Sequence, residues 1–228
     1  MCGLDAVSVT AAWNMREDSP IEGMRSPESQ GVQKQIGLLT PALILHGYTR
    51  GIFPMAINRG GDIGWFSPDP RAIIPLDDRF HIPHGLKRAL RKGNFEITID
   101  HDFEAVIQSC ATAHGDTWIS EEIVTNYCEL HRLGWAHSVE VWRGGKLAGG
   151  LYGVAIGGAF FGESMFYHAT DASKIALVAL VERLRRQEFA LLDTQWTTPH
   201  LEQFGTVQIP KEEYLELLHE AVGFERTF

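Results

Sequence analysis

Two pairs of adjacent glycines divide the centre of this chain into three apolar segments. Residues 139–142 alternate Val-Glu-Val-Trp, and this period of two predicts a β-strand. The glycines at 144–145 and 157–158 predict tight turns, because glycine adopts the positive φ that such turns require. Residues 138–166 are therefore expected to form an antiparallel meander of three strands.

An acid and a hydroxyl, Glu163 and Ser164, lie near the end of this meander, where we expect them at the rim of an apolar sheet. A nucleophilic serine is not expected, because Gly162–Phe166 lacks the second glycine of a nucleophile elbow. A helix is predicted from about Asp171, followed by a strand at Ala190–Asp193. This order of elements predicts an α/β (α+β) fold with a GCN5-like N-acyltransferase core.

The rest of the chain divides at breaks marked by proline, glycine and capping residues. Residues 1–30 are polar and irregular and are predicted to be a weakly ordered leader, residues 31–78 a small N-terminal α/β domain, and residues 79–228 the N-acyltransferase-like catalytic domain. The expected helices are 41 to about 48–50, 84–92, 102–111, 120–133, 171–186, near 199–204 and 211–222; the other expected strands are 63–66, about 71–75 and 95–99.

Composition and charge limit the possible locations and partners. Three cysteines make a sparse, odd set that fits a reducing cytoplasm. No apolar run of about 20 residues is present, so no membrane span is expected. The net charge of −9 argues against general nucleic-acid binding, which is usually accompanied by a basic balance.

Two local basic clusters are candidates for contact with RNA phosphates, and solvated helix faces are the alternative interpretation. One consists of Lys87, Arg88, Arg91 and Lys92, and the other of Arg183, Arg185 and Arg186.

No cofactor is expected. The segment before the helix at Asp171 has no glycine-rich loop to hold a pyrophosphate, and the charge of Asp171 would repel one, so the acyl donor is not expected to be a coenzyme A thioester. The His81/His84 and Cys128/His131 pairs lack a second pair at zinc-site spacing, so no metal is expected.

Several separate stretches share a family resemblance. They are residues 47–54 (GYTRGIFP), 65–71 (WFSPDPR), 117–119 (TWI), 140–166 and 192–195 (LDTQ). In this order they resemble the motifs of bacterial leucyl/phenylalanyl-tRNA–protein transferases, over about residues 36–218. The resemblance implies transfer of Leu or Phe from aminoacyl-tRNA to proteins that begin with Lys or Arg, marking them for degradation by the N-degron pathway. It implies a cytoplasmic enzyme, and we expect a monomer.

The resemblance also implies the active-site residues. Asp193 and Gln195 match the proposed catalytic pair, and strand alternation places them on one face. Glu163 matches another active-site position, where it would bind the incoming amine or a cationic first side chain. The alternatives are a polar strand end that caps the next helix, and a buried Glu163 satisfied by backbone amides or by Lys174.

The donor-binding positions are implied in the same way. Phe66, where better-known members carry Trp, and Trp118 match aromatics that stack on the terminal adenine of tRNA; an interdomain core is the alternative. The apolar side-chain pocket matches Leu151, Phe161, Phe166, Leu180 and Leu184. Leu180 and Leu184 replace aromatics of well-known members and also have ordinary helical core spacing.

Two other functions remain open at this point. One is a related tRNA-dependent peptide-bond-forming acyltransferase of the FemX-like class, although the long coiled-coil insertion frequent in that class is missing. The other is a catalytically silent module that binds RNA or degrons.

Overall fold

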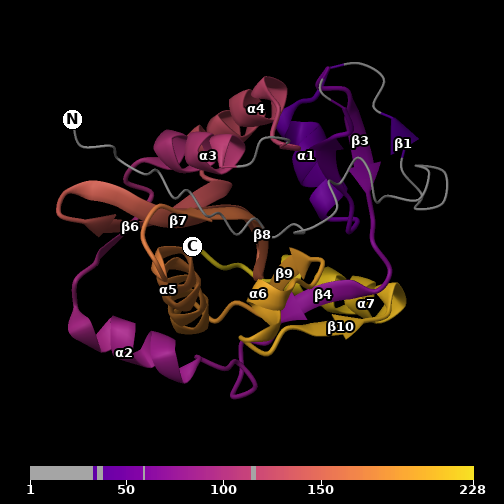
Figure 1. The fold of residues 1–228 in the computed structure, drawn as a ribbon. Helices are drawn as coiled ribbons and strands as arrows, with labels where there is room; N and C mark the ends of the chain where they lie inside the picture. The colour runs from indigo at the N-terminus through magenta and orange to yellow at the C-terminus, as the bar shows by residue number, and fades with distance from the viewer. Residues whose placement is uncertain (1–32, 35–37, 59, 114–116) are drawn as a thin grey trace.

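The structure is a computed structural model that describes residues 33–34, 38–58, 60–113 and 117–228 (Figure 1). The leader predicted for residues 1–30 lies outside the described residues.

A seven-stranded mixed sheet forms the centre of the molecule, in the order β10-β4-β9-β8-β7-β6-β5. Strands β8 and β9 are parallel, and all other neighbours are antiparallel. The predicted meander is confirmed as β6–β7–β8. The strand bounds are β4 (Arg71–Ile74), β5 (Glu96–Ile99), β6 (Ala136–Arg143), β7 (Lys146–Ile156), β8 (Ala159–Tyr167), β9 (Leu191–Gln195) and β10 (Val207–Ile209).

Helices cover both faces of this sheet (Figure 1). The first apolar core takes side chains from α1 (Pro41–Tyr48), α3 (Phe103–Thr112), α4 (Glu121–Arg132) and α7 (Lys211–Val222). The second takes them from α2 (His84–Lys92), α5 (Ala172–Arg186) and α6 (Pro199–Glu202). Adjacent residues of one strand contribute to different cores: Phe160 packs in the second core and Phe161 in the first. This alternation places the two cores on opposite faces of the sheet.

Side-chain caps begin the helices where the sequence predicts. The Thr40 hydroxyl accepts a hydrogen bond from the Leu43 amide at 3.3 Å, and the Ser120 hydroxyl accepts one from the Ile123 amide at 3.4 Å. Each cap satisfies an amide that the first helical turn leaves unpaired. None of the helices in the described part of the chain is long and apolar enough to span a membrane.

A second, smaller sheet has the order β1-β3-β2, with β1 at Gln33–Lys34, β2 at Phe53–Ala56 and β3 at Ile63–Phe66. Strands β1, β2 and β10 were not predicted. In β2 a proline interrupts the run and consecutive residues are buried, so no alternation of polar and apolar residues marks it. The division between residues 78 and 79 stays a prediction; residues 71–74, on its N-terminal side, form β4 of the large sheet.

Candidate active site

The parallel strands β8 and β9 separate at the point where the candidate catalytic residues lie. Their pairing runs from Ala159 opposite Leu191 to Phe161 opposite Asp193. Beyond that point β8 continues with β7, whereas β9 continues with β4. The side chains of Glu163 and Gln195, which follow the last pair on each strand, are joined there by a hydrogen bond of 3.1 Å.

Each of these strands has a β-bulge just beyond the last parallel pair. On β8, Gly162 lies opposite Gly153 and Ser164 opposite Tyr152, which leaves Glu163 as the extra residue. On β9, a second register shift leaves Thr194 as the extra residue between Asp193 and Gln195. Bulges bend a strand and re-aim the side chain of the extra residue.

The expected position of Glu163 at the rim of the sheet is wrong. Glu163 lies inside β8, which continues to Tyr167, and it is only 3% exposed. The sequence does not reveal this because the polar Glu163-Ser164 pair interrupts an apolar run in the way a strand end does.

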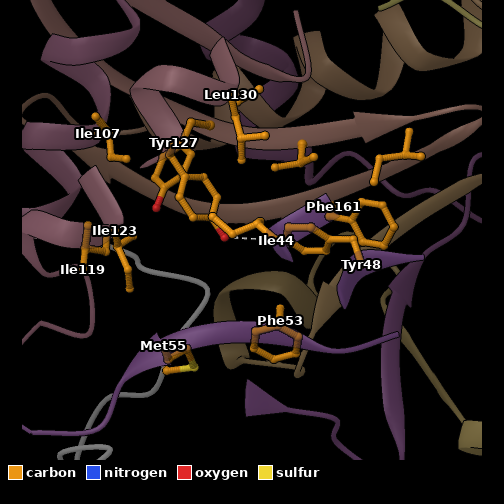
Figure 2. Close-up of a cluster of buried hydrophobic side chains, with 14 of the residues drawn as sticks. Ile44, Tyr48, Phe53, Met55, Ile107, Ile119, Ile123, Tyr127, Leu130 and Phe161 are labelled. Carbon is orange, nitrogen blue, oxygen red and sulfur yellow. Dashed lines mark hydrogen bonds between the residues drawn. The ribbon is translucent and has the colours of Figure 1, made fainter. Parts of the chain in front are cut away.

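The Glu163 carboxylate lies among neutral hydroxyl and amide groups. Gln195 Nε2 donates to Glu163 Oε1 at 3.1 Å, and the Tyr127 hydroxyl donates to Oε2 at 3.5 Å. The hydroxyls of Tyr48 and Tyr127 are 2.5 Å apart, and Figure 2 shows them pointing toward one another from α1 and α4. Burial raises the pKa of Glu163 to about 8, with a further contribution from the negative charge of Asp193. A carboxyl group with this pKa exchanges its proton near neutral pH.

This raised pKa predicts a pH-dependent stability. Between the ordinary glutamate pKa of about 4.3 and the folded value, the folded protein holds a proton that the unfolded chain has lost. Stability is therefore expected to fall as pH rises through this window, by up to about 1.4 kcal/mol per pH unit. Because Glu163→Gln removes the titration, its stability relative to the wild type should increase with pH. Urea unfolding of both proteins between about pH 5 and pH 8 measures this difference; a constant difference would contradict it.

The Asp193 carboxylate is fully buried and has a donor at each of its acceptor positions. Its Oδ1 accepts from Arg71 Nε and from the Gln195 amide, both at 2.9 Å. Its Oδ2 accepts from Arg71 Nη2 at 2.6 Å and from the Tyr214 hydroxyl at 2.8 Å. An ionised carboxylate has about four acceptor sites, so in this arrangement Asp193 has none left for a substrate proton.

Sequence reasoning missed four of these neighbours, Tyr48, Tyr127, Arg71 and Tyr214. Tyr48 and Arg71 belong to two of the stretches that carry the resemblance, and this was the only sequence signal for them. Tyr127 and Tyr214 occupy ordinary core positions of helices, from which no role at a site is predictable. The alternative partner proposed for Glu163, Lys174, lies instead 3.6 Å from Asp171.

The two candidate stacking aromatics are mostly buried: Phe66 ends strand β3 of the small sheet, and Trp118 lies next to strand β2. The Phe66 ring, 4% exposed, packs with the rings of Phe53 and Trp196 at centroid distances of 6.2 and 6.5 Å. Trp118 is 8% exposed, and its carbonyl accepts from the Ala56 amide at 3.0 Å. Both side chains belong to the first apolar core. A stacked base therefore requires one of these rings to become more exposed.

The five apolar candidates for a side-chain pocket do not lie together. Phe161 and Phe166 pack in the first core, on the face that carries Glu163 and Tyr127. The other three, Leu151, Leu180 and Leu184, pack in the second core across the sheet. All five are fully buried.

The basic clusters differ in how free their side chains are. All four basic residues of α2 are exposed: Lys87, Arg88, Arg91 and Lys92. On α5, Arg185 donates to the carbonyls of Leu76 and Asp77, and Arg183 lies 4.7 Å from the Phe228 ring centroid. The α2 cluster is therefore the freer of the two to contact an anionic partner.

Two further features lie apart from this site. A surface hollow of about 710 Å³ between α3 and α4 is lined by residues such as Glu104, Cys128 and Arg132, and its lining does not include Glu163, Asp193 or Gln195. Over the described ranges there is no group of three or more His, Cys, Asp or Glu residues placed to hold a metal ion.

Comparison with known proteins identifies the family. A model of the leucyl/phenylalanyl-tRNA protein transferase family matches residues 73–219, and the model of its N-terminal domain matches residues 37–69. The chain belongs to this family. A leucyl/phenylalanyl-tRNA–protein transferase from Akkermansia muciniphila is 58% identical over 81% of this chain and 96% of its own length. Relatives of the same name from Herpetosiphon aurantiacus and Rubrobacter xylanophilus are 53% and 55% identical, each over 83% of this chain and 98% of its own length.

The family predicted from the motifs is thus confirmed, and with it the prediction that the protein is an enzyme of the transferase class. The mixed α/β fold is confirmed as well. A solved ribosomal-protein-alanine N-acetyltransferase from Brucella melitensis biovar Abortus 2308 aligns with 49% of this chain and 84% of its own, at 15% identity and a TM-score of 0.33. That score is too low to support an argument, so the GCN5-like core stays a prediction.

Proposed function

We propose that this enzyme moves Leu or Phe from aminoacyl-tRNA to the α-amine of proteins that begin with Lys or Arg, and so marks them for degradation by the N-degron pathway. The name that its relatives share, leucyl/phenylalanyl-tRNA–protein transferase, supports these donors and a protein acceptor. We further propose that it acts as a cytoplasmic monomer without a cofactor.

The proposed reaction is aminolysis of an activated ester. The neutral α-amine attacks the ester carbonyl, an amide bond forms and the bond to the ribose oxygen breaks. The proton that the amine loses ends on that oxygen, which leaves as a ribose hydroxyl. A free α-amine has a pKa of about 7.7–8.0, so a useful fraction is neutral near pH 7. The enzyme therefore needs no covalent nucleophile; it aligns the two reactants and manages one proton.

The observation that carries this proposal is the buried Glu163–Gln195 pair, which is joined by a hydrogen bond of 3.1 Å where β8 and β9 each have a β-bulge. A carboxyl group with a pKa of about 8 can bind a cationic amine in its ionised form and can accept the amine's proton. Gln195 contributes an amide that orients the reactants. The acceptor sites of Asp193 are already filled, and one of them supports Gln195 by accepting a hydrogen bond from its backbone N–H.

For the donor, we propose that Phe66 and Trp118 stack on the terminal adenine and that exposed basic residues of α2 contact RNA phosphates. Phe161 and Phe166 share a face with Glu163, which favours them over Leu151, Leu180 and Leu184 as the walls of the side-chain pocket.

A transfer assay tests the proposed function. Purified protein is incubated with radiolabelled Leu-, Phe- or Met-tRNA and one of three peptides, which begin with Arg, with Ala, or with an acetylated residue followed by an internal Lys. We expect transfer of Leu and Phe to the Arg peptide only. Transfer to the internal Lys would indicate a FemX-like ligase, and tRNA binding without transfer would indicate a silent module.

Trp118→Ala is expected to raise the KM for aminoacyl-tRNA about 5- to 150-fold, which corresponds to the loss of one stacked base worth roughly 1–3 kcal/mol. The single-turnover rate at saturating tRNA should fall much less, because the lost contact is equal in the ground and transition states. Thermal unfolding provides the control. A large loss of stability with unchanged KM would show that Trp118 serves only the core.

A further inference from the structure

We propose that Arg71 is a positioning residue for the transfer reaction. It holds Asp193, and Asp193 in turn holds the backbone N–H of Gln195, so that the side-chain amide of Gln195 faces Glu163. This inference rests on the role proposed above for Gln195. Arg71 lies on β4 and approaches the site from the side opposite β8, since β9 lies between these two strands.

Arg71 is held on all sides, as a positioning residue must be. It is 1% exposed, and its guanidinium lies between the rings of Phe53 and Tyr214, at 4.9 and 4.5 Å from their centroids. Its Nη1 donates to the Gly51 carbonyl at 3.1 Å, and its Nε and Nη2 each donate to one oxygen of Asp193. Burial disfavours the charge on Arg71, but Asp193 outweighs this and the pKa lies above its usual value.

The bidentate contact orients Asp193 as well as neutralising it. A guanidinium donates two parallel hydrogen bonds to a carboxylate, which fixes the plane of the carboxylate. Asp193 Oδ1 accepts a hydrogen bond from Arg71 Nε, and the same oxygen accepts one from the backbone N–H of Gln195 at 2.9 Å. A rotation of the carboxylate would therefore move the acceptor away from Gln195.

Gln195 needs this support because its backbone is in an unfavourable conformation. Its φ is +58°, in the left-handed region that long side chains rarely adopt. This conformation follows the bulge at Thr194 and ends β9, while the Gln195 side chain reaches Glu163 at 3.1 Å. Without Asp193 as the acceptor for its backbone N–H, Gln195 would relax toward an ordinary strand conformation, and its side chain would move away from Glu163.

A lysine at position 71 would keep the charge but not the geometry. Its ammonium is a single point and does not present the planar pair of donors that fixes a carboxylate. Arg71→Lys therefore separates orientation from neutralisation, and it is the central variant of the test.

The experiment measures kcat, KM for aminoacyl-tRNA and Tm for the full chain carrying Arg71→Lys, Gln195→Ala, or both. Arg79→Lys is the matched control, because Arg79 makes the same bidentate contact at the exposed surface, with Nε donating to Asp77 Oδ1 and Nη2 to Asp77 Oδ2. We expect Arg71→Lys to lower kcat about 10- to 100-fold, the size of effect of a small misplacement in an active site. KM should stay within about twofold, and Arg79→Lys should match the wild type in all three quantities.

The double variant distinguishes positioning from general support of the fold. If Arg71 acts through Gln195, kcat of Arg71→Lys/Gln195→Ala should be no lower than that of Gln195→Ala alone. The inference would be overturned if the losses of kcat in the two single variants multiplied in the double variant. It would also be overturned if Arg71→Lys kept the wild-type kcat while Gln195→Ala lost activity. A wild-type kcat for Gln195→Ala would instead overturn the proposed role of Gln195 itself.

A second pair of substitutions applies if Arg71→Lys does not fold. Arg71→Met with Asp193→Leu replaces the buried ion pair by apolar side chains of similar size, an exchange that often leaves stability unchanged. We expect a folded protein with kcat near that of Gln195→Ala, because the Asp193 oxygen that accepts from the backbone N–H of Gln195 is gone. A wild-type kcat in this folded double variant would also overturn the inference.

Discussion

Replacing Asp193 with alanine is expected to destabilise the protein by about 3–5 kcal/mol and to abolish transfer. The variant leaves the Arg71 guanidinium charged, buried and without its counter-ion, and it leaves the Tyr214 hydroxyl without its acceptor. Removing one partner of a buried pair is costly because the remaining charge lacks both water and a counter-charge. Transfer is lost because Gln195 loses the acceptor for its amide.

Urea unfolding and single-turnover transfer measure the two effects. Asp77→Ala, at the exposed ion pair with Arg79, is the matched control and should change neither quantity. Asp193→Asn should be less destabilising, because its side-chain oxygen can still accept the two hydrogen bonds made to one of the carboxylate oxygens. An Asp193→Ala protein with wild-type stability would show that the pair with Arg71 contributes nothing to folding. An Asp193→Ala protein with wild-type transfer activity would show that the reaction does not require Asp193.

Gln195→Ala should lower kcat by about 10²–10³-fold, the range measured for the loss of one well-placed polar group in an active site. The substitution deletes the amide that faces Glu163 and keeps the backbone hydrogen bond to Asp193. The cost in stability should be modest, near 1 kcal/mol, because one neutral hydrogen bond is lost. Single-turnover transfer and urea unfolding of the same preparations give both values.

Two comparisons make this prediction specific. Gln187→Ala, at the exposed end of α5, should leave kcat at the wild-type level. Gln195→Asn keeps the amide on a shorter side chain and suits the left-handed backbone better. If reach to Glu163 is what matters, Gln195→Asn should be nearly as slow as Gln195→Ala. Full activity in Gln195→Ala would move the chemistry to other residues.

The sequence by itself determined most of the local elements, apart from the short strands β1, β2 and β10, and the family. Glycines at 144–145 and 157–158 marked the turns of the meander, where Gly144, Gly145 and Gly157 have φ of +58°, +71° and +57°. Thr40 and Ser120 marked helix starts. These features are predictable because turn conformations and caps depend on residues within a few positions of one another. The motifs then identified the family, because they occur in the same order along the chain.

Only the tertiary structure decided how the site is built. Arg71 and Asp193 are 122 positions apart, and no local pattern pairs them. The bulges at Glu163 and Thr194 follow from how β8 meets β7 and how β9 meets β4. The sequence shows only a polar pair at 163–164 that interrupts an apolar run, and Glu163 was therefore expected at a rim.

The apolar pocket candidates illustrate the same limit. A side chain's hydrophobicity predicts burial, but the face of the sheet that buries it depends on the pairing of the strands and the packing of the helices. Phe161 and Phe166 thus lie on one face and Leu151, Leu180 and Leu184 on the other, which their residue types do not reveal.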